Sequence, residues 1–199
     1  MAEHENTTDR MLPWIKRYQA GDEAAWKQAI QHAHNRMKRI ARKRLRNSGL
    51  RSHEQTDDLV NETCLRLLKA FPAERKDRPD TVRGFFAFAT KKMRETLIDM
   101  YRRDRRFPRE TEVPAVQDSG TGPTIKAARA DTDRRVHELV DRLPDEEREA
   151  WGLHYYQGLT YAAAAAVLCV SSKTVERRVI AAKHKLHGWL VANGLGPEA

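Results

Sequence analysis

The sequence predicts an all-α fold of two small helical domains joined by a flexible linker, the C-terminal one a helix-turn-helix. Apolar residues recur at intervals of three and four along most of the chain, which is the period of an amphipathic helix. That period lapses over 107–130, a stretch with three prolines and two glycines that is typical of a linker. We therefore expect a disordered N-terminus over 1–8, helical domains over 9–106 and 131–190, and a C-terminal tail over 191–199.

The first domain is expected to begin with helices over 9–20 and from 22 to about 47. Gly21 is a good stop for the first of them and Asp22 a good N-cap for the second. The second half of the latter helix, with the sequence RMKRIARKRLR, is basic nearly everywhere off its apolar stripe.

A third helix is expected to begin at Thr56 as its N-cap, with Asp57 and Asp58 in a first turn that favours negative charge. Its inward face is predicted to consist of Val60, Cys64, Leu67, Leu68 and Phe71. An acidic helix start is unusual in a basic protein. It indicates either a well-capped helix or a surface that meets a partner.

A fourth helix is predicted from Val82 to about Arg103, with the core stripe Phe86, Ala89, Met93, Leu97 and Met100. Lysines and arginines cover the rest of this segment, and Phe85, Phe88 and Tyr101 lie near them. Aromatic rings among cations suit stacking on unpaired bases together with phosphate contacts. Packing in the core is the alternative role for each Phe.

The second domain is expected to contain a helix around Val136 and another that starts with Pro144 at its first position and acids in its first turn. That helix is predicted to turn Trp151 and Tyr155 inward and to stop at Gly158. From there to Trp189 the chain is predicted to form two short helices joined by a tight turn.

Thr160 is expected to cap the first of these two helices, over 161–168, and a serine pair to cap the second. The second helix is predicted to bury Val175, Val179, Ala182 and Leu186 and to present Lys173, Arg177, Ile180 and His184 on the opposite side. One apolar and one basic face are typical of a recognition helix that enters the major groove. An ordinary helical hairpin with solvated cations is the alternative.

The charge of the chain is unevenly distributed around a net value of +9. Residues 31–51 carry eight Lys/Arg and no Asp/Glu, and residues 83–109 carry nine against three. Residues 131–172 are acidic, with eight Asp/Glu against four Lys/Arg. Separate basic blocks indicate several contacts along a polyanion.

The N-terminal MAEHENTTDR lacks an apolar segment, and the longest apolar run, 162–170, is too short to cross a membrane. We therefore expect a cytoplasmic protein without membrane insertion. Cys64 and Cys169 show no metal-binding spacing, as expected in a reducing compartment, and Cys64 is predicted to be a small core residue.

Several motifs in order carry a family resemblance. They are AGD at 20–22, TDDLVNETCLRLL at 56–68, FFAFATKKMRETLIDMYRRDRR at 85–106, and LPDEEREAWGLHYYQGLTY leading into VSSKTVERRV. Together they resemble bacterial RNA polymerase sigma factors, most closely the extracytoplasmic-function (ECF) class and its ECF-like branch. The resemblance covers nearly all of 12–190.

The resemblance implies three sets of contacts. Duplex DNA of the −35 element would be read by Ser172, Lys173, Thr174, Arg177 and Arg178. The −10 element would be melted and read by the fourth helix and the loop before it, through Phe85, Phe88, Lys91, Lys92, Arg94, Arg102 and Arg103. The beta-prime clamp helices of core RNA polymerase would be met by Asp57, Asp58, Asn61 and Glu62. The resemblance also implies the beta flap as a contact and leaves an anti-sigma partner open.

Two departures from the family pattern stand out. The family usually has glycine where Cys169 stands, because the helix ends there in a left-handed residue, so strain is expected at this turn. The family also usually has a branched aliphatic at Ala164 and acids at Ala162 and Ala163. A run of alanines favours helix but packs thinly.

Two other readings compete with a sigma factor. A stand-alone helix-turn-helix regulator, or a sigma-like mimic acting on an anti-sigma factor, would leave the third and fourth helices without a role. A metal hydrolase using His32, His34 and Glu62 is disfavoured, because histidines two apart on a helix point about 200° away from each other. We therefore expect no enzyme activity, no cofactor and no metal.

Overall fold

The computed structural model describes residues 6–45, 53–70, 79–106 and 123–195. Every regular element within these ranges is a helix and no strand occurs in them, so the predicted all-α class is confirmed. The N-terminal unit consists of α1 (Asn6–Gln19), α2 (Glu23–Leu45), α3 (His53–Ala70) and α4 (Val82–Arg106). The C-terminal unit consists of α5 (Pro123–Leu139), η1 (Val140–Arg142), α6 (Asp145–Trp151), η2 (Gly152–Tyr156), α7 (Tyr161–Leu168) and α8 (Ser172–Ala192).

An aromatic cluster forms the centre of the N-terminal unit. Tyr18 of α1 stacks on Trp26 of α2, with ring centroids 4.7 Å apart. Trp26 meets Phe85 of α4 edge to face at 5.4 Å, and Phe85 meets Phe86 at 5.6 Å. These contacts join α1, α2 and α4 into one core, against which α3 packs through residues such as Leu67.

The start of α2 follows the sequence prediction, whereas the start of α3 does not. Asp22 Oδ1 accepts hydrogen bonds from the backbone N–H of Ala24 at 3.0 Å and of Ala25 at 3.2 Å, which makes it the expected cap. The prediction that Thr56 caps α3 is wrong, because the helix already begins at His53. Thr56 is instead the fourth residue of the helix, and it is buried.

The predicted end of the linker and the predicted end of the disordered N-terminus also need correction. Helix α5 begins at Pro123, so residues 123–130, predicted as linker, are helical. Proline suits the first turn of a helix and the alanines that follow are strong helix formers, although they carry no apolar period. Helix α1 likewise begins at Asn6, inside the predicted disordered 1–8. Residues 107–122, and most of the loop before α4, lie outside the described residues.

The C-terminal unit is organised around α6 and η2. Pro144 is the N-cap of α6 and not its first residue, one position from the prediction. Trp151 and Tyr155 stack with ring centroids 4.9 Å apart and interplanar angle 12°, in keeping with their predicted inward direction. The α-helix passes into a π-helical turn at Gly152 and ends at Gln157, close to the predicted stop at Gly158.

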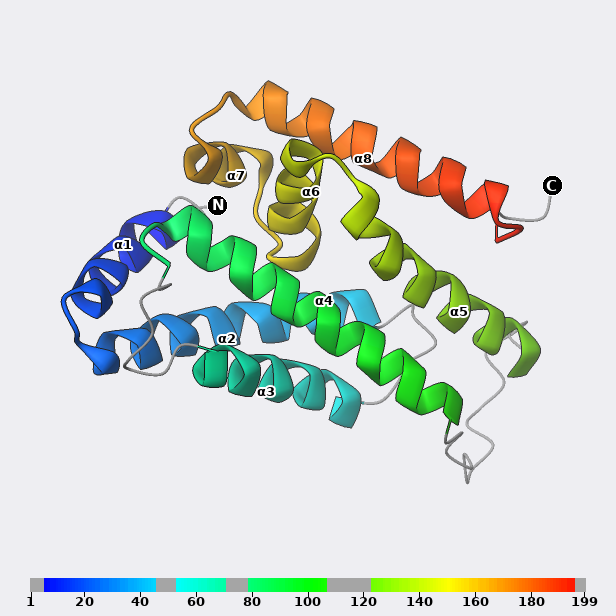
Figure 1. The fold of residues 1–199 in the computed structure, drawn as a ribbon, viewed down its shortest axis with the longest axis horizontal. Helices are drawn as coiled ribbons and strands as arrows, with labels where there is room; N and C mark the ends of the chain where they lie inside the picture. The colour runs from blue at the N-terminus through cyan, green and yellow to red at the C-terminus, as the bar shows by residue number, and fades with distance from the viewer. Residues whose placement is uncertain (1–5, 46–52, 71–78, 107–122, 196–199) are drawn as a thin grey trace.

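Helix α4 lies between the two units. Figure 1 shows it running diagonally, with α1, α2 and α3 on one side and α5, α6 and α7 on the other. Helix α5 runs beside the C-terminal half of α4, and α8 forms the outer edge of the C-terminal unit. Helices α3 and α8 therefore face opposite sides of the molecule.

Candidate nucleic-acid and polymerase interface

Helices α7 and α8 are joined by a tight turn whose geometry is fixed at both ends. Thr160 Oγ1 accepts from the Ala163 N–H at 3.2 Å and caps α7, as predicted. Cys169 ends α7 in the left-handed conformation (φ 55°, ψ 43°). It is the one residue other than glycine with positive φ in the described part of the chain. Ser171 Oγ then accepts from the Thr174 N–H at 3.1 Å and caps α8.

The predicted core face of α8 is buried. Val175, Val179, Ala182 and Leu186 all lie inside the C-terminal unit, in the same core as Ala164 and Leu168 of α7. The run of alanines in α7 is buried as well, at Ala163, Ala164 and Ala165. Small side chains let α7 lie close to α8 and also contact α1 and α4.

The opposite face of α8 is open. Lys173, Arg177 and His184 are exposed on it, and the Ile180 residue is 46% exposed. Ser172 is exposed at the start of the helix, whereas Thr174 is half-buried and its hydroxyl lies 2.8 Å from Ser171 Oγ. This face is both basic and accessible.

Arg178 is held differently from its neighbour Arg177. Its Nη2 donates to Glu146 Oε2 of α6 at 2.5 Å, and 18% of its side chain is exposed. Lys185 makes a similar bond to Glu147 at 2.6 Å. Arg178 therefore links α8 to α6, and unlike Lys173 and Arg177 it is not on the exposed basic face of α8.

Phe85 does not lie on the surface of α4. Its exposure is 0%, and its ring is enclosed by Trp26 and Phe86. The assignment of Phe85 to DNA contact is thus incompatible with its position, because a ring in the core cannot stack on a base. Phe88 is partly buried, and the Lys92 ammonium lies 5.5 Å from its ring centroid. Lys92 also donates to Glu95 at 2.8 Å.

The cations predicted to meet the −10 element point to different sides of α4. Arg94 has only 7% of its side chain exposed, and its Nη2 lies 2.5 Å from Asp141 Oδ1 of the C-terminal unit. Arg102 donates to Glu138 of α5 at 3.2 Å. Lys91 and Arg103 are exposed. In this arrangement the predicted set does not form one continuous surface.

The outer face of α3 carries most of the predicted polymerase contacts. Asp58 and Asn61 are exposed, whereas Asp57 accepts from Lys38 Nζ of α2, a hydrogen bond that lowers the pKa of its carboxyl. Glu62 accepts from Arg66 Nε at 2.9 Å. Arg66 also donates to Asp99 of α4 at 2.9 Å, so it links α3 to α4.

Two leucines on the same face of α3 were not predicted. Leu65 is 48% exposed and Leu68 is 38% exposed, so the prediction that Leu68 faces the core is wrong. Residues 58, 61, 65 and 68 recur at intervals of three and four and therefore share one side of the helix. Exposed leucines beside acids could have been noticed in the sequence, because Leu65 falls off the apolar stripe.

The remaining candidate groups do not assemble into a metal site. No cluster of three or more His, Cys, Asp or Glu residues suited to a metal ion occurs in the described residues. The His32 ring lies 5.3 Å from Trp14. Cys64 is buried as predicted, and burial raises the pKa of its thiol to about 11. None of the described helices has both the length and the apolar character needed to cross a membrane.

These features define a class. Two helices joined by a tight turn, the second open and basic on its outer side, are typical of DNA-binding transcription proteins. A second long basic helix, α4, and a partly apolar, acidic face on α3 add surfaces that a simple DNA-binding module does not need.

Comparison with known proteins narrows the class to one family. The family model of the ECF sigma factor matches residues 9–191, and this chain belongs to that family. The ECF RNA polymerase sigma factor SigD of Mycobacterium tuberculosis is 30% identical over 178 residues, which span 88% of this chain and 81% of that protein. The ECF RNA polymerase sigma factor ShbA of Streptomyces griseus is 28% identical over 151 residues, 73% of this chain and 77% of the relative. Family membership supports a sigma-factor role in transcription initiation, in a class of non-enzymatic transcription factors.

Proposed function

We propose that this protein binds core RNA polymerase and directs it to promoters, where it recognises two DNA elements and helps to separate the strands. The observation that carries the proposal is the open, basic outer face of α8 in a chain that belongs to the ECF sigma factor family. A protein that works with RNA polymerase and chromosomal DNA acts in the cytoplasm, which is the location that we propose.

Helix α8 is proposed to read the −35 element as duplex DNA. Lys173 and Arg177 lie on its exposed face, close to its N-terminal end, where a recognition helix meets base edges. An arginine can donate two hydrogen bonds to a guanine, which makes Arg177 the strongest candidate for sequence reading. Arg178 is proposed to support the position of α8 through Glu146 and to contact phosphate only at the edge of the interface.

Helix α3 is proposed to dock on the beta-prime clamp helices of the polymerase. Asp58 and Asn61 offer polar contacts, and Leu65 and Leu68 add apolar surface at their side. Exposed leucines gain free energy when a partner covers them, and the neighbouring acid provides specificity for a basic partner. The C-terminal unit is proposed to meet the beta flap.

Helix α4 is proposed to melt and bind the −10 element. Lys91, Lys92 and Arg103 offer charge, and Phe88 offers a ring that is only partly buried. Stacking favours unpaired bases because a base exposes its face only after the strands separate. Arg94 and Arg102 would join this surface only after their bonds to the C-terminal unit are broken.

Duplex reading is tested by replacing Arg177 with alanine. Loss of a bidentate base contact should weaken binding to a −35 duplex, selected from a promoter library, by a factor of about 5 to 150. Lys183→Ala is the matched control, because Lys183 is exposed on the same helix but lies off the reading face. Equal losses in the two variants would show that α8 contributes charge alone.

Polymerase docking is tested by Leu65→Lys and Asp58→Lys, each of which should abolish co-purification with core polymerase while leaving helical content intact. Gln28→Lys, exposed on α2, adds the same charge as Leu65→Lys elsewhere on the N-terminal unit and should have no effect. A stand-alone regulator or a sigma-like mimic predicts no polymerase binding by any version of the protein. Retention of polymerase binding by the α3 variants would show that docking occurs elsewhere.

A further inference from the structure

One side of α4 is covered by the C-terminal unit along most of its length. Arg83, Thr90, Arg94, Tyr101 and Arg105 follow one another at intervals of seven, four, seven and four residues, so they form a single stripe. Each of them forms a hydrogen bond or an ion pair with α5, η1, α6 or the residue that ends η2. The stripe is distinct from the core face of α4, so this helix has a second covered side, on which Arg94 and Tyr101 are buried and Arg83 and Arg105 stay exposed.

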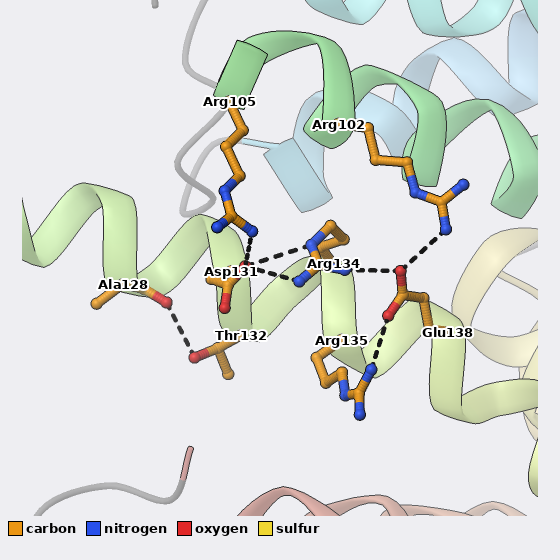
Figure 2. A network of polar contacts seen from close by, with 8 residues as sticks. All are labelled: Arg102, Arg105, Ala128, Asp131, Thr132, Arg134, Arg135 and Glu138. Atoms are coloured by element: carbon orange, nitrogen blue, oxygen red, sulfur yellow. Dashed lines mark hydrogen bonds and ion pairs between the residues drawn. The ribbon is translucent and has the colours of Figure 1, made fainter. Parts of the chain in front are cut away.

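The polar contacts join cations of α4 to acids of the C-terminal unit. Figure 2 shows Arg102 and Arg105 pointing from α4 toward α5, where Arg102 Nη2 lies 3.2 Å from Glu138 Oε1 and Arg105 Nη1 lies 3.8 Å from Asp131 Oδ1. Arg134 of α5 bridges the same two acids, at 2.8 Å from Asp131 and 2.7 Å from Glu138.

The same pattern continues toward the N-terminal end of α4. Arg83 makes two hydrogen bonds to the Glu149 carboxylate, at 3.2 and 2.5 Å. Arg94 is held by Asp141, as described above, and the Tyr101 hydroxyl donates to Asp133 at 3.4 Å. Carboxylates of the acidic segment 131–172 thus pair with cations of the basic segment 83–109, in the positions that DNA phosphates would take.

The two units lie close together at Gly152. A Cβ atom at this position would lie 2.8 Å from Thr90 Cγ2. Thr90 Oγ1 in turn accepts from Gln157 Nε2 at 3.3 Å. The backbone of Gly152 (φ −57°, ψ −49°) is helical and would suit any residue. Glycine is therefore favoured here by the lack of space for a side chain, not by its backbone conformation.

The interface is also incompletely packed. A cavity of about 300 Å³ lies between α4 and the C-terminal unit, lined by Arg83, Thr90, Arg94, Asp141 and Gly152 among others. Two of the cations at its wall, Arg83 and Arg94, are already paired with acids across the interface. Each of these two ion pairs has one exposed partner, which indicates a contact that can open and that salt weakens.

This arrangement cannot serve both promoter elements at once. Elements centred at −10 and −35 are separated by 25 base pairs, which is roughly 85 Å of duplex at 3.4 Å per base pair. Helix α4, with 25 residues, is only about 38 Å long, and α8 belongs to a unit that packs directly on it. The units must separate before α4 and α8 reach their elements together.

We propose that the free protein inhibits itself: the acidic side of α5, η1 and α6 binds cations of α4 in place of DNA phosphates and keeps Arg94 and Arg102 from joining the −10 surface. The proposal rests on the proposed role of α4. The outer faces of α3 and α8 stay exposed in this closed state. Polymerase can therefore dock, and duplex DNA can be read, before the −10 surface is complete.

A disulfide that locks the units together tests the proposal. The Thr90 Cβ lies 3.6 Å from the Cβ position of residue 152, which matches disulfide geometry, so we would prepare Thr90→Cys with Gly152→Cys. Cys169→Gly removes the exposed native thiol in this background. The oxidised protein should lose at least tenfold in affinity for a fluorescent single-stranded DNA of mixed sequence, and recover it on reduction. Its affinity for duplex DNA should change little, because α8 remains open.

Gly152→Ala provides the opposite perturbation. The added methyl group should open the interface and raise the affinity for single-stranded DNA severalfold. Thr90→Ala should reverse this gain, because the nearest remaining atom of residue 90, its Cβ, is 3.6 Å away and makes an ordinary contact. Small-angle X-ray scattering should show a more extended Gly152→Ala protein and a compact double variant.

The outcomes separate the closed state from the proposed function. If the disulfide fails to form, or if oxidised and reduced proteins bind single-stranded DNA equally, self-inhibition is refuted and the role of α4 stands. If neither the reduced protein nor Gly152→Ala binds single-stranded DNA, the role of α4 fails and the proposal fails with it. Loss on oxidation together with gain in Gly152→Ala supports self-inhibition.

Discussion

Replacement of Cys169 by glycine should stabilise the protein. Cys169 has φ 55° and ψ 43°, a left-handed conformation that costs a residue with a Cβ about 1–2 kcal/mol. Glycine avoids this cost but loses about 0.5–1 kcal/mol through the greater freedom of the unfolded chain. The thiol is exposed and makes only a weak contact, 3.9 Å from the Ala166 carbonyl oxygen, so little else is lost. The expected net gain is therefore about 0.5–1 kcal/mol.

Urea titration followed by circular dichroism measures this gain directly. For a chain of this size, 1 kcal/mol corresponds to a rise in Tm of about 2–4 °C. Cys169→Ala is the matched control, because alanine also lacks the thiol but keeps the Cβ. The alanine variant should be no more stable than the natural protein. Duplex binding should be unchanged in both variants, because the reading face of α8 is untouched.

Two results would refute this reasoning. A stabilisation of equal size in the alanine variant would show that the thiol, and not the backbone, carries the cost. No gain from glycine would mean that the turn at Cys169 is relaxed in solution. Either result would contradict the expectation that cysteine, in place of the family's usual glycine, strains the turn at position 169.

Three further predictions follow from burial and hydrogen bonding. Phe85→Ala should destabilise the protein by about 3–5 kcal/mol, whereas Phe88→Ala should cost less and mainly weaken binding to single-stranded DNA, as urea titration and fluorescence anisotropy would show. Burial and the nearby Arg94 lower the pKa of His137 from 6.5 to about 3. The neutral ring therefore contributes its full stability above pH 6.5. This stability is lost as the pH falls from 6.5 toward 3, by up to about 1.4 kcal/mol per pH unit. The urea midpoints measured near neutrality and at mildly acidic pH should differ less in His137→Gln than in the natural protein. Asp22→Ala should cost about 1 kcal/mol through loss of the α2 cap, and Asp22→Ser should restore most of it.

The helices and their buried faces could be predicted from the sequence. Spacing alone predicts four core residues in α8, and all of them are buried: Val175, Val179, Ala182 and Leu186. Spacing succeeds here because a helix is built from local hydrogen bonds and its apolar stripe faces the largest nearby apolar surface. The cap at Thr160 was predictable for the same local reason.

Helix boundaries are harder to predict where helix propensity and the apolar period disagree. Residues 123–130 lack an apolar stripe and so resemble a linker, yet they form the first turns of α5. The sequence does not indicate the start of α3 at His53, because Thr56 offers a plausible cap. A cap residue signals a helix start only when its side chain is free to turn back on the backbone, and Thr56 is buried.

The partners of the charged side chains were decided by tertiary structure alone. Arg177 and Arg178 are neighbours of the same type, but only Arg178 meets an acid of α6, because α8 lies across that helix. Arg94 is nearly buried because α4 has a second covered side that only the C-terminal unit creates. Period and composition show which faces are apolar or basic. They do not show which distant segment neutralises a charge, because an ion pair requires two side chains to meet in space, and their spacing in the sequence does not encode that meeting.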